Sequence, residues 1–111
     1  MVFAFDLDGN IQYTNSNDKR LASFWEITTP NTQAVIETAI TNAMAQEPAA
    51  DGTWPLFGGR SMALHLVFKN GQELEELQLI SIKGTIYLID SSPECVVTLM
   101  WPILSNSAVV A

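Results

Sequence analysis

A turn signal near the N-terminus constrains the fold of this chain more than any other feature. Asp8-Gly9-Asn10 separates two β-prone runs, residues 2–7 and residues 11–14. All three turn residues tolerate a positive backbone φ angle, and the apolar alternation of the first run continues after them. The sequence therefore predicts that the chain opens with an antiparallel hairpin, in which Asp8 and Gly9 reverse its direction.

The clearest helical signal lies in the middle of the chain. Thr28 or Thr29 can cap a helix, and Pro30 suits its first turn. The residues that follow show the spacing of one buried helical stripe: Val35, Ile36, Ala39, Ile40, Ala43 and Met44. We predict a helix over residues 31–46, preceded by a short helix over residues 19–27.

Alternating apolar residues return after residue 60 and predict a three-stranded meander. Its strands cover residues 61–68, 74–82 and 85–89. Asn70-Gly71 is predicted to form the first turn, and Lys83-Gly84 the second.

The segments on either side of the meander are less regular. Residues 49–60 contain glycine and proline but also Trp54, Leu56 and Phe57, so this apolar loop must pack against something. At the other end, Ser91, Ser92 and Pro93 are predicted to break the last strand, and another β-prone run begins at residue 94.

Together these elements predict an α+β domain with a five- to six-stranded antiparallel sheet and helices on one face. A chain of 111 residues has the length of one domain. We expect a core over about residues 2–90 and a C-terminal extension over residues 94–111.

Charge and composition exclude several classes of partner. The formal net charge is -7, and nucleic-acid or anionic-membrane binding depends on basic side chains, so we expect neither partner. The apolar run from residue 95 to residue 104 is about half the length of a spanning helix and contains Pro102. No secretory signal is evident, and the single cysteine fits a reducing compartment, so we expect a cytoplasmic protein.

Residues 2–15, VFAFDLDGNIQYTN, resemble the opening of a PAS domain, in which a hydrophobic strand, an Asp-Gly turn and a second strand lead to an asparagine. Residues 24–27, the helix start at Pro30 and the stripe over residues 35–44 are similar to the helical middle of that family. The meander stands where the family has its three closing strands, although profilin-like and longin folds share this order of elements. The PAS-like resemblance implies a sensory or interaction domain with a ligand cavity on the helical side of its sheet.

Under this resemblance, the candidate ligand-binding residues are Trp25, Trp54 and Phe57, with Met62 or His65 completing the site. Which strand face carries the last two is left open. The alternative for each aromatic residue is core packing, and for His65 it is a position on a strand face.

We predict no metal site and no catalytic residue, and the cofactor remains unknown. His65 is the only histidine, and it lies outside the predicted helix where a haem-binding PAS domain would carry its ligand. Cys95 lies outside the helical motif of flavin-binding PAS domains. Haem held by a helix histidine and a flavin-cysteinyl adduct are therefore disfavoured.

The expected function is that of a non-catalytic, PAS-like sensory or protein-interaction module in signal transduction. Apolar residues occur on both faces of the meander, and helices on one face would leave the other face exposed, so we expect a homo-oligomer or a partner protein there. A stand-alone acidic adaptor or inhibitor is the alternative.

An enzymatic alternative rests on the first strand. Asp6 and Asp8 also match the start of haloacid-dehalogenase-like phosphatases, in which two such carboxylates act beside magnesium. Here Asn10 stands where that family usually has threonine, and no second acidic motif follows. We therefore expect that the chain is not an enzyme.

Overall fold

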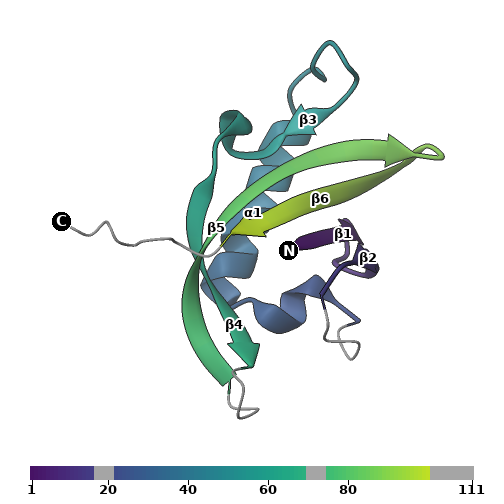
Figure 1. Ribbon diagram of the computed structural model, residues 1–111. Helices are drawn as coiled ribbons and strands as arrows, with labels where there is room; N and C mark the ends of the chain where they lie inside the picture. The colour runs from purple at the N-terminus through teal and green to yellow at the C-terminus, as the bar shows by residue number, and fades with distance from the viewer. Residues whose placement is uncertain (17–21, 70–74, 101–111) are drawn as a thin grey trace.

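The computed structural model describes residues 1–16, 22–69 and 75–100, and its main element is a six-stranded antiparallel sheet (Figure 1). The strand order is β2-β1-β6-β5-β3, and β4 also pairs with β5. The strands are β1 (Val2–Asp6), β2 (Ile11–Thr14), β3 (Trp54–Pro55), β4 (Met62–Lys69), β5 (Glu75–Ile89) and β6 (Ser92–Met100). A helix, α1 (Pro30–Met44), crosses one face of the sheet, so the predicted α+β fold with an antiparallel sheet is confirmed.

The predicted opening hairpin is present. β1 and β2 are antiparallel, with Phe3 opposite Thr14 and Phe5 opposite Ile11. Gly9 adopts a φ of 91° in the turn, a conformation that glycine reaches without steric cost. The indole of Trp25 fills the space that a Cβ atom on Gly9 would need. The turn therefore requires glycine both for its backbone and for this contact.

The predicted central helix is also present. The hydroxyl oxygen of Thr29 accepts a hydrogen bond from the N–H of Thr32 (3.1 Å), and Pro30 occupies the first turn. The hydroxyl of Thr32 donates in turn to the backbone oxygen of His65 on β4 (2.7 Å). Ile36 and Ile40 are buried on the side that faces the sheet. Capping and one apolar stripe thus fix both the start of α1 and its orientation.

A short 3-10 helix, η1 (Phe24–Ile27), precedes α1. Ser23 and Glu26 form a capping box at its start. The hydroxyl oxygen of Ser23 accepts a hydrogen bond from the N–H of Trp25, and the carboxylate of Glu26 accepts one from the N–H of Ser23. The helix predicted over residues 19–27 is observed only from Phe24, and residues 17–21 lie outside the described part of the chain.

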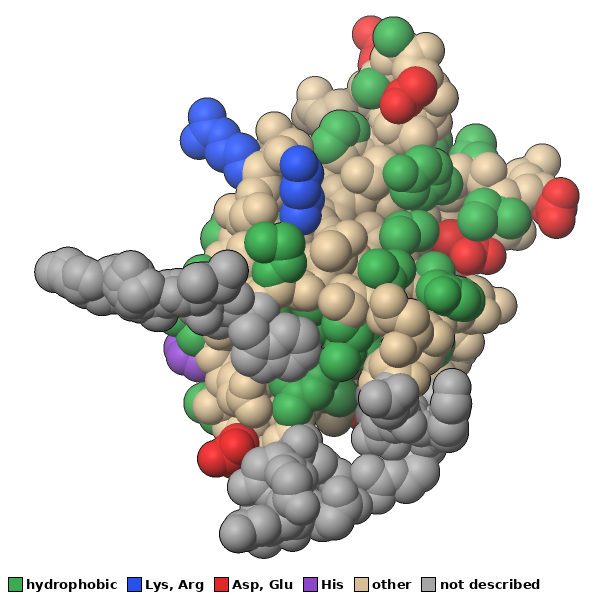
Figure 2. All heavy atoms as spheres, viewed as in Figure 1, with side chains coloured by type: hydrophobic (Ala, Val, Ile, Leu, Met, Phe, Trp, Pro, Cys, Tyr) green, Lys and Arg blue, Asp and Glu red, His purple; other side chains and the backbone are tan. Residues whose placement is uncertain are grey.

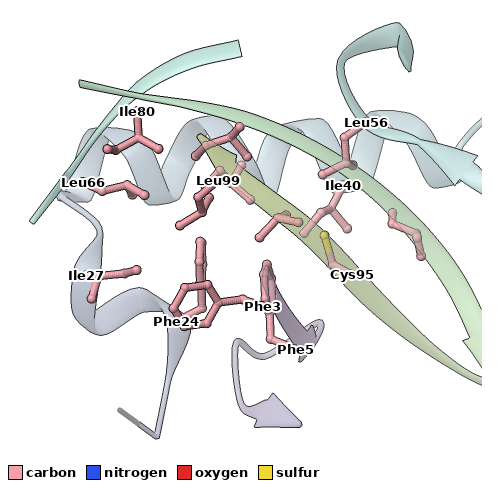
Figure 3. Packing of buried hydrophobic residues seen from close by; sticks show 14 residues of the cluster. Phe3, Phe5, Phe24, Ile27, Ile40, Leu56, Leu66, Ile80, Cys95 and Leu99 are labelled. Carbon is pink, nitrogen blue, oxygen red and sulfur yellow. The ribbon is translucent and has the colours of Figure 1, made fainter. Parts of the chain in front are cut away.

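The core fills the layer between the sheet and the helical side (Figure 3). Phe24 lies between Phe3, at 5.3 Å between ring centroids, and Phe5, whose ring it stacks on at 4.5 Å. The sheet contributes further fully buried side chains: Leu66, Ile80, Ile82, Ile86, Cys95, Val97 and Leu99. Apolar burial on one face of the sheet is therefore the main stabilising contribution.

The predicted turn at Lys83-Gly84 is wrong. β5 continues without a break for 15 residues, and the reversal comes at Asp90 and Ser91, both at positive φ (51° and 67°). Gly84 is part of the strand and pairs with Val97, and a Cβ atom there would lie 2.9 Å from Leu56 Cδ1. Glycine here provides room for a packed leucine instead of a change of direction.

The C-terminal extension predicted over residues 94–111 begins inside the sheet, because residues 94–100 belong to β6; residues 101–111 lie outside the described part of the chain. β6 lies between β1 and β5, with Val97 opposite both Phe3 and Gly84. The strand end predicted at Ser91, Ser92 and Pro93 is close to the observed end of β5 at Ile89, and Pro93 is accommodated in β6 just after the turn, beyond Glu94, the last residue that pairs with β1. The predicted turn at Asn70-Gly71 lies outside the described residues.

Candidate functional site

A groove of about 620 Å³ lies beside the C-terminal half of α1, between this helix and the segment that contains β3 and a second 3-10 helix, η2 (Leu56–Gly59). Its volume falls within the range typical of small-molecule sites. The groove is lined by Val35, Thr38, Ala39, Asn42, Ala43, Gln46, Glu47, Trp54, Pro55, Phe57, Gly58 and Met62.

The helix supplies one wall of this groove. Ala39 and Ala43 are half-buried, next to the stripe of Ile36 and Ile40 that faces the sheet, and Val35 is 40% exposed. Alanine side chains are short, so this flank of the helix leaves space where larger residues would fill it. The apolar stripe of α1 is thus wider than the contact with the sheet requires.

The opposite wall is held in place from both sides. Trp54 pairs with Ile86 of β5, and its indole N–H donates to the backbone oxygen of Gln46 at the end of α1 (3.2 Å). Leu56 is fully buried over Gly84. These contacts fix residues 54 and 56, and the residues that follow in η2, Phe57 and Gly58, form the rim of the groove.

Phe57 has the least favourable backbone conformation along this rim. Its φ and ψ are 55° and 33°, and Gly58 follows at 66° and 24°. The left-handed region is easily reached by glycine but costs about 1–2 kcal/mol for a residue with a side chain. A bulky residue held in such a conformation is a common sign of function, and here it places an aromatic ring in the groove wall.

The structure brings together three of the five predicted ligand-binding residues. Trp54, Phe57 and Met62 all line the groove, and Met62 is 37% exposed there. Trp25 lies elsewhere: its ring packs against Phe5 and Gly9, and its N–H donates to the backbone oxygen of Asp8 (3.0 Å). For Trp25, the core-packing alternative describes the observed contacts.

His65 also lies away from the groove. It is exposed on β4, three residues after Met62, and successive strand residues alternate between faces. Met62 pairs with Ile82 on the helix side of the sheet, whereas His65 pairs with Leu79 on the opposite side. The open question of which residue faces the helical side is answered in favour of Met62.

Sequence reasoning missed the helical wall of the groove. The spacing of Val35, Ala39 and Ala43 is that of a core-facing helix and predicts a place in the buried stripe. The signal that distinguishes them is size: two alanines alternate with two isoleucines along the stripe. The isoleucines fill the core, and the alanines border the groove.

Asp6 and Asp8 both take part in the hairpin turn. The carboxylate of Asp6 accepts hydrogen bonds from the N–H groups of Asp8 (3.0 Å) and Asn10 (2.9 Å) and from the side-chain amide of Asn10 (3.1 Å). Burial alone would raise the pKa of Asp6, but these hydrogen bonds outweigh it and lower the pKa below the usual 3.8. β1 leads into an antiparallel strand, whereas the phosphatase alternative requires a parallel strand followed by a helix.

We expect Asp6→Asn to lower stability at neutral pH, because the ionised carboxylate is the form that these donors stabilise. A lowered pKa in the folded state contributes stability above the unfolded value, about 3.9, and this contribution disappears as the pH falls through the folded value. The difference in urea midpoint between wild type and variant should therefore shrink below about pH 4. The matched control is Asp8→Asn, since Asp8 contributes its backbone to the turn; a pH-independent effect of Asp6→Asn would contradict the assignment.

Cys95 is buried in the core. Burial raises the pKa of Cys95 to about 12, so its thiol remains protonated in the folded protein. Across residues 1–16, 22–69 and 75–100, no three His, Cys, Asp or Glu side chains are grouped so as to hold a metal ion. In the same ranges, no helix has the length and apolar character needed to span a membrane.

Comparison with known proteins adds no assignment to this geometry. No protein-family model matches the sequence, and no curated protein matches it. The interpretation of the groove therefore depends on its own residues.

Proposed function

We propose that this chain is a non-catalytic, PAS-like binding domain, and that the groove beside α1 holds a small apolar ligand. The observation that carries the proposal is that Trp54, Phe57 and Met62, from the consecutive elements β3, η2 and β4, all border open space beside a flank of α1 with alanine side chains. Large apolar side chains that border open space, with few polar groups among them, are typical of ligand sites.

The arrangement of the core supports this position for a ligand. The layer between α1 and the sheet is occupied by fully buried side chains such as Ile36, Ile82 and Leu56. The groove begins where this packing ends, at the edge next to β3. A ligand in the groove contacts both α1 and the segment before β4. Binding can therefore shift the position of these two elements relative to each other, and a partner can detect that shift.

The proposal predicts that filling the groove displaces the ligand without unfolding the protein. Ala43→Phe places a ring in the space between α1 and Trp54, whereas Ala34→Phe adds the same ring at an exposed position elsewhere on the helix. We expect freshly purified wild type and Ala34→Phe to retain a small molecule in native mass spectrometry, and Ala43→Phe to be empty.

A second variant separates ligand binding from stability. Phe57→Asn removes the ring, but asparagine tolerates the left-handed conformation, so the lost contact and the relieved strain nearly cancel in unfolding free energy. We expect loss of the retained molecule with little change in the urea midpoint. A wild-type protein that is empty, and whose stability no apolar molecule changes, would contradict the proposal and favour the acidic adaptor.

The face of the sheet opposite α1, which no described helix or strand covers, favours a second role, in association between copies of the chain. Figure 2 shows hydrophobic side chains distributed over this face, the one that Figure 1 views with α1 behind the sheet. Leu77 and Leu79 on β5 are 59% and 46% exposed, and Met100 on β6 is 57% exposed. The same face carries Lys83 and Glu94, which two copies packed face to face can pair with each other.

Sedimentation tests this association. We propose that the protein dimerises at micromolar concentration, and that Leu79→Lys shifts it toward monomer because the substitution introduces a charge on the apolar face. Leu88→Lys is the control. Leu88 is 54% exposed next to the turn between β5 and β6, but its side chain lies on the side of the sheet that faces α1. A wild type that remains monomeric with no partner bound would contradict the self-association.

A further inference from the structure

We propose that the ligand of this groove is a cationic amphiphile: a small molecule with an apolar body and a positively charged amine. This inference depends on the groove being a ligand site, as proposed above, and it specifies the chemistry of the ligand. The charges around the groove, the direction of α1 and the aromatic side chains in the groove wall all favour such a ligand.

The charges of the groove favour a cation. Of the described residues that line it, Glu47 alone is charged, and the other polar ones are neutral: Thr38, Asn42 and Gln46. The nearest basic residue in sequence, Arg60, follows η2 and is not part of the lining. Among the described residues that line the groove, a carboxylate or phosphate would therefore meet one acidic side chain and no basic one.

The helix adds to this preference. α1 runs along the groove toward Glu47, so its C-terminal end, which carries partial negative charge, lies at the same end as the carboxylate. The last turn of α1 contains no basic side chain that would neutralise this end. A cation placed there is attracted by both the helix terminus and Glu47.

Aromatic side chains complete the site at this end. Trp54 is fixed beside the last turn of the helix by its hydrogen bond to Gln46, and Phe57 lines the groove as well. Aromatic rings attract an ammonium group within about 6 Å of the ring centre. The apolar part of the ligand would lie along Val35, Ala39 and Ala43, which span about 12 Å of the helix axis.

Three straight-chain probes with the same number of carbon atoms test the proposal: octylamine, octanol and octanoate. At pH 7 they are cationic, neutral and anionic, respectively. Each probe is titrated into the protein, and the chemical shift of the Trp54 indole N–H is followed by NMR. The affinity is taken from this shift, so binding at the groove is observed directly. We expect octylamine to bind at least about ten times more tightly than octanol, and octanoate to bind most weakly. Glu47→Gln should remove most of the difference between amine and alcohol, and Glu37→Gln, on another part of α1, should preserve it.

The outcomes separate this inference from the proposed function. If octanol and octylamine bind equally well and Glu47→Gln changes neither affinity, the cationic preference is overturned while the groove remains a ligand site. If none of the three probes moves the Trp54 signal, both the inference and the proposed ligand site are overturned. A ranking with octanoate first would also overturn the inference.

Discussion

Gly9→Ala should lower the free energy of unfolding by about 3 kcal/mol or more, since two costs act at the same residue. The backbone of Gly9 has a φ of 91°, where any side chain is strained. The new Cβ atom would also occupy the position of the Trp25 indole, which is packed against Phe5 and Phe24. The indole would have to leave its place and lose its hydrogen bond to Asp8.

Gly52→Ala is the matched control for this experiment. Gly52 has a similar φ of 82°, but no heavy atom lies within 4 Å of the position its Cβ atom would take. We therefore expect Gly52→Ala to cost only the backbone strain, about 1–2 kcal/mol. Urea denaturation of the two variants measures the difference. Equal destabilisation of the two variants would contradict the close packing of the Trp25 indole against Gly9 in the hairpin turn.

Phe24→Ala should cost about 3–5 kcal/mol, the usual range for removing a buried aromatic ring. Phe24 is fully buried, and it joins η1 to the sheet through the rings of Phe3 and Phe5. Its loss leaves a cavity between the N-terminal hairpin and the segment that leads into α1. Because a small domain has a total stability of about 5–15 kcal/mol, the variant should unfold at a much lower urea concentration.

Tyr13→Ala provides the comparison for Phe24→Ala. Tyr13 is also aromatic and lies on β2, but it is 59% exposed, so we expect a change within about 0.5 kcal/mol. Both variants are measured by urea denaturation followed by circular dichroism. A loss below about 1 kcal/mol for Phe24→Ala would show that the ring cluster is not part of the cooperative core.

Local signals in the sequence were sufficient for the first hairpin and for α1. Asp8-Gly9 has the backbone freedom that a reversal needs, and Thr29 with Pro30 marks the start of a helix whose apolar stripe continues to Met44. These features act over a few residues, so they can be recognised without knowing the rest of the fold.

Tertiary contacts account for what the sequence did not reveal. Gly84 lies within β5, where Leu56 from another segment packs over it, and no local pattern indicates that contact. β3 exists because Trp54 and Pro55 reach β5 at Ile86 and Thr85. Both features depend on a loop that the sequence described only as apolar.

The candidate site shows the same division. The sequence identified the aromatic residues as unusual, and the structure separated Trp25, which supports the hairpin turn, from Trp54 and Phe57, which line the groove. Spacing alone cannot distinguish these roles, because a tryptophan that fills a core and one that lines a site are both large and apolar. The left-handed backbone of Phe57 is visible only in the folded chain.

Chemical-shift mapping with octanol, a neutral apolar probe, tests the central claim most directly. The account predicts saturable shifts at residues from both walls of the groove, Ala39 and Ala43 on α1 and Trp54 and Phe57 opposite them. Signals from Leu77 and Leu79, on the uncovered face of the sheet, should not change in the same titration. Shifts confined to that face, or no saturable shift at the groove, would contradict the claim that this groove is a ligand site.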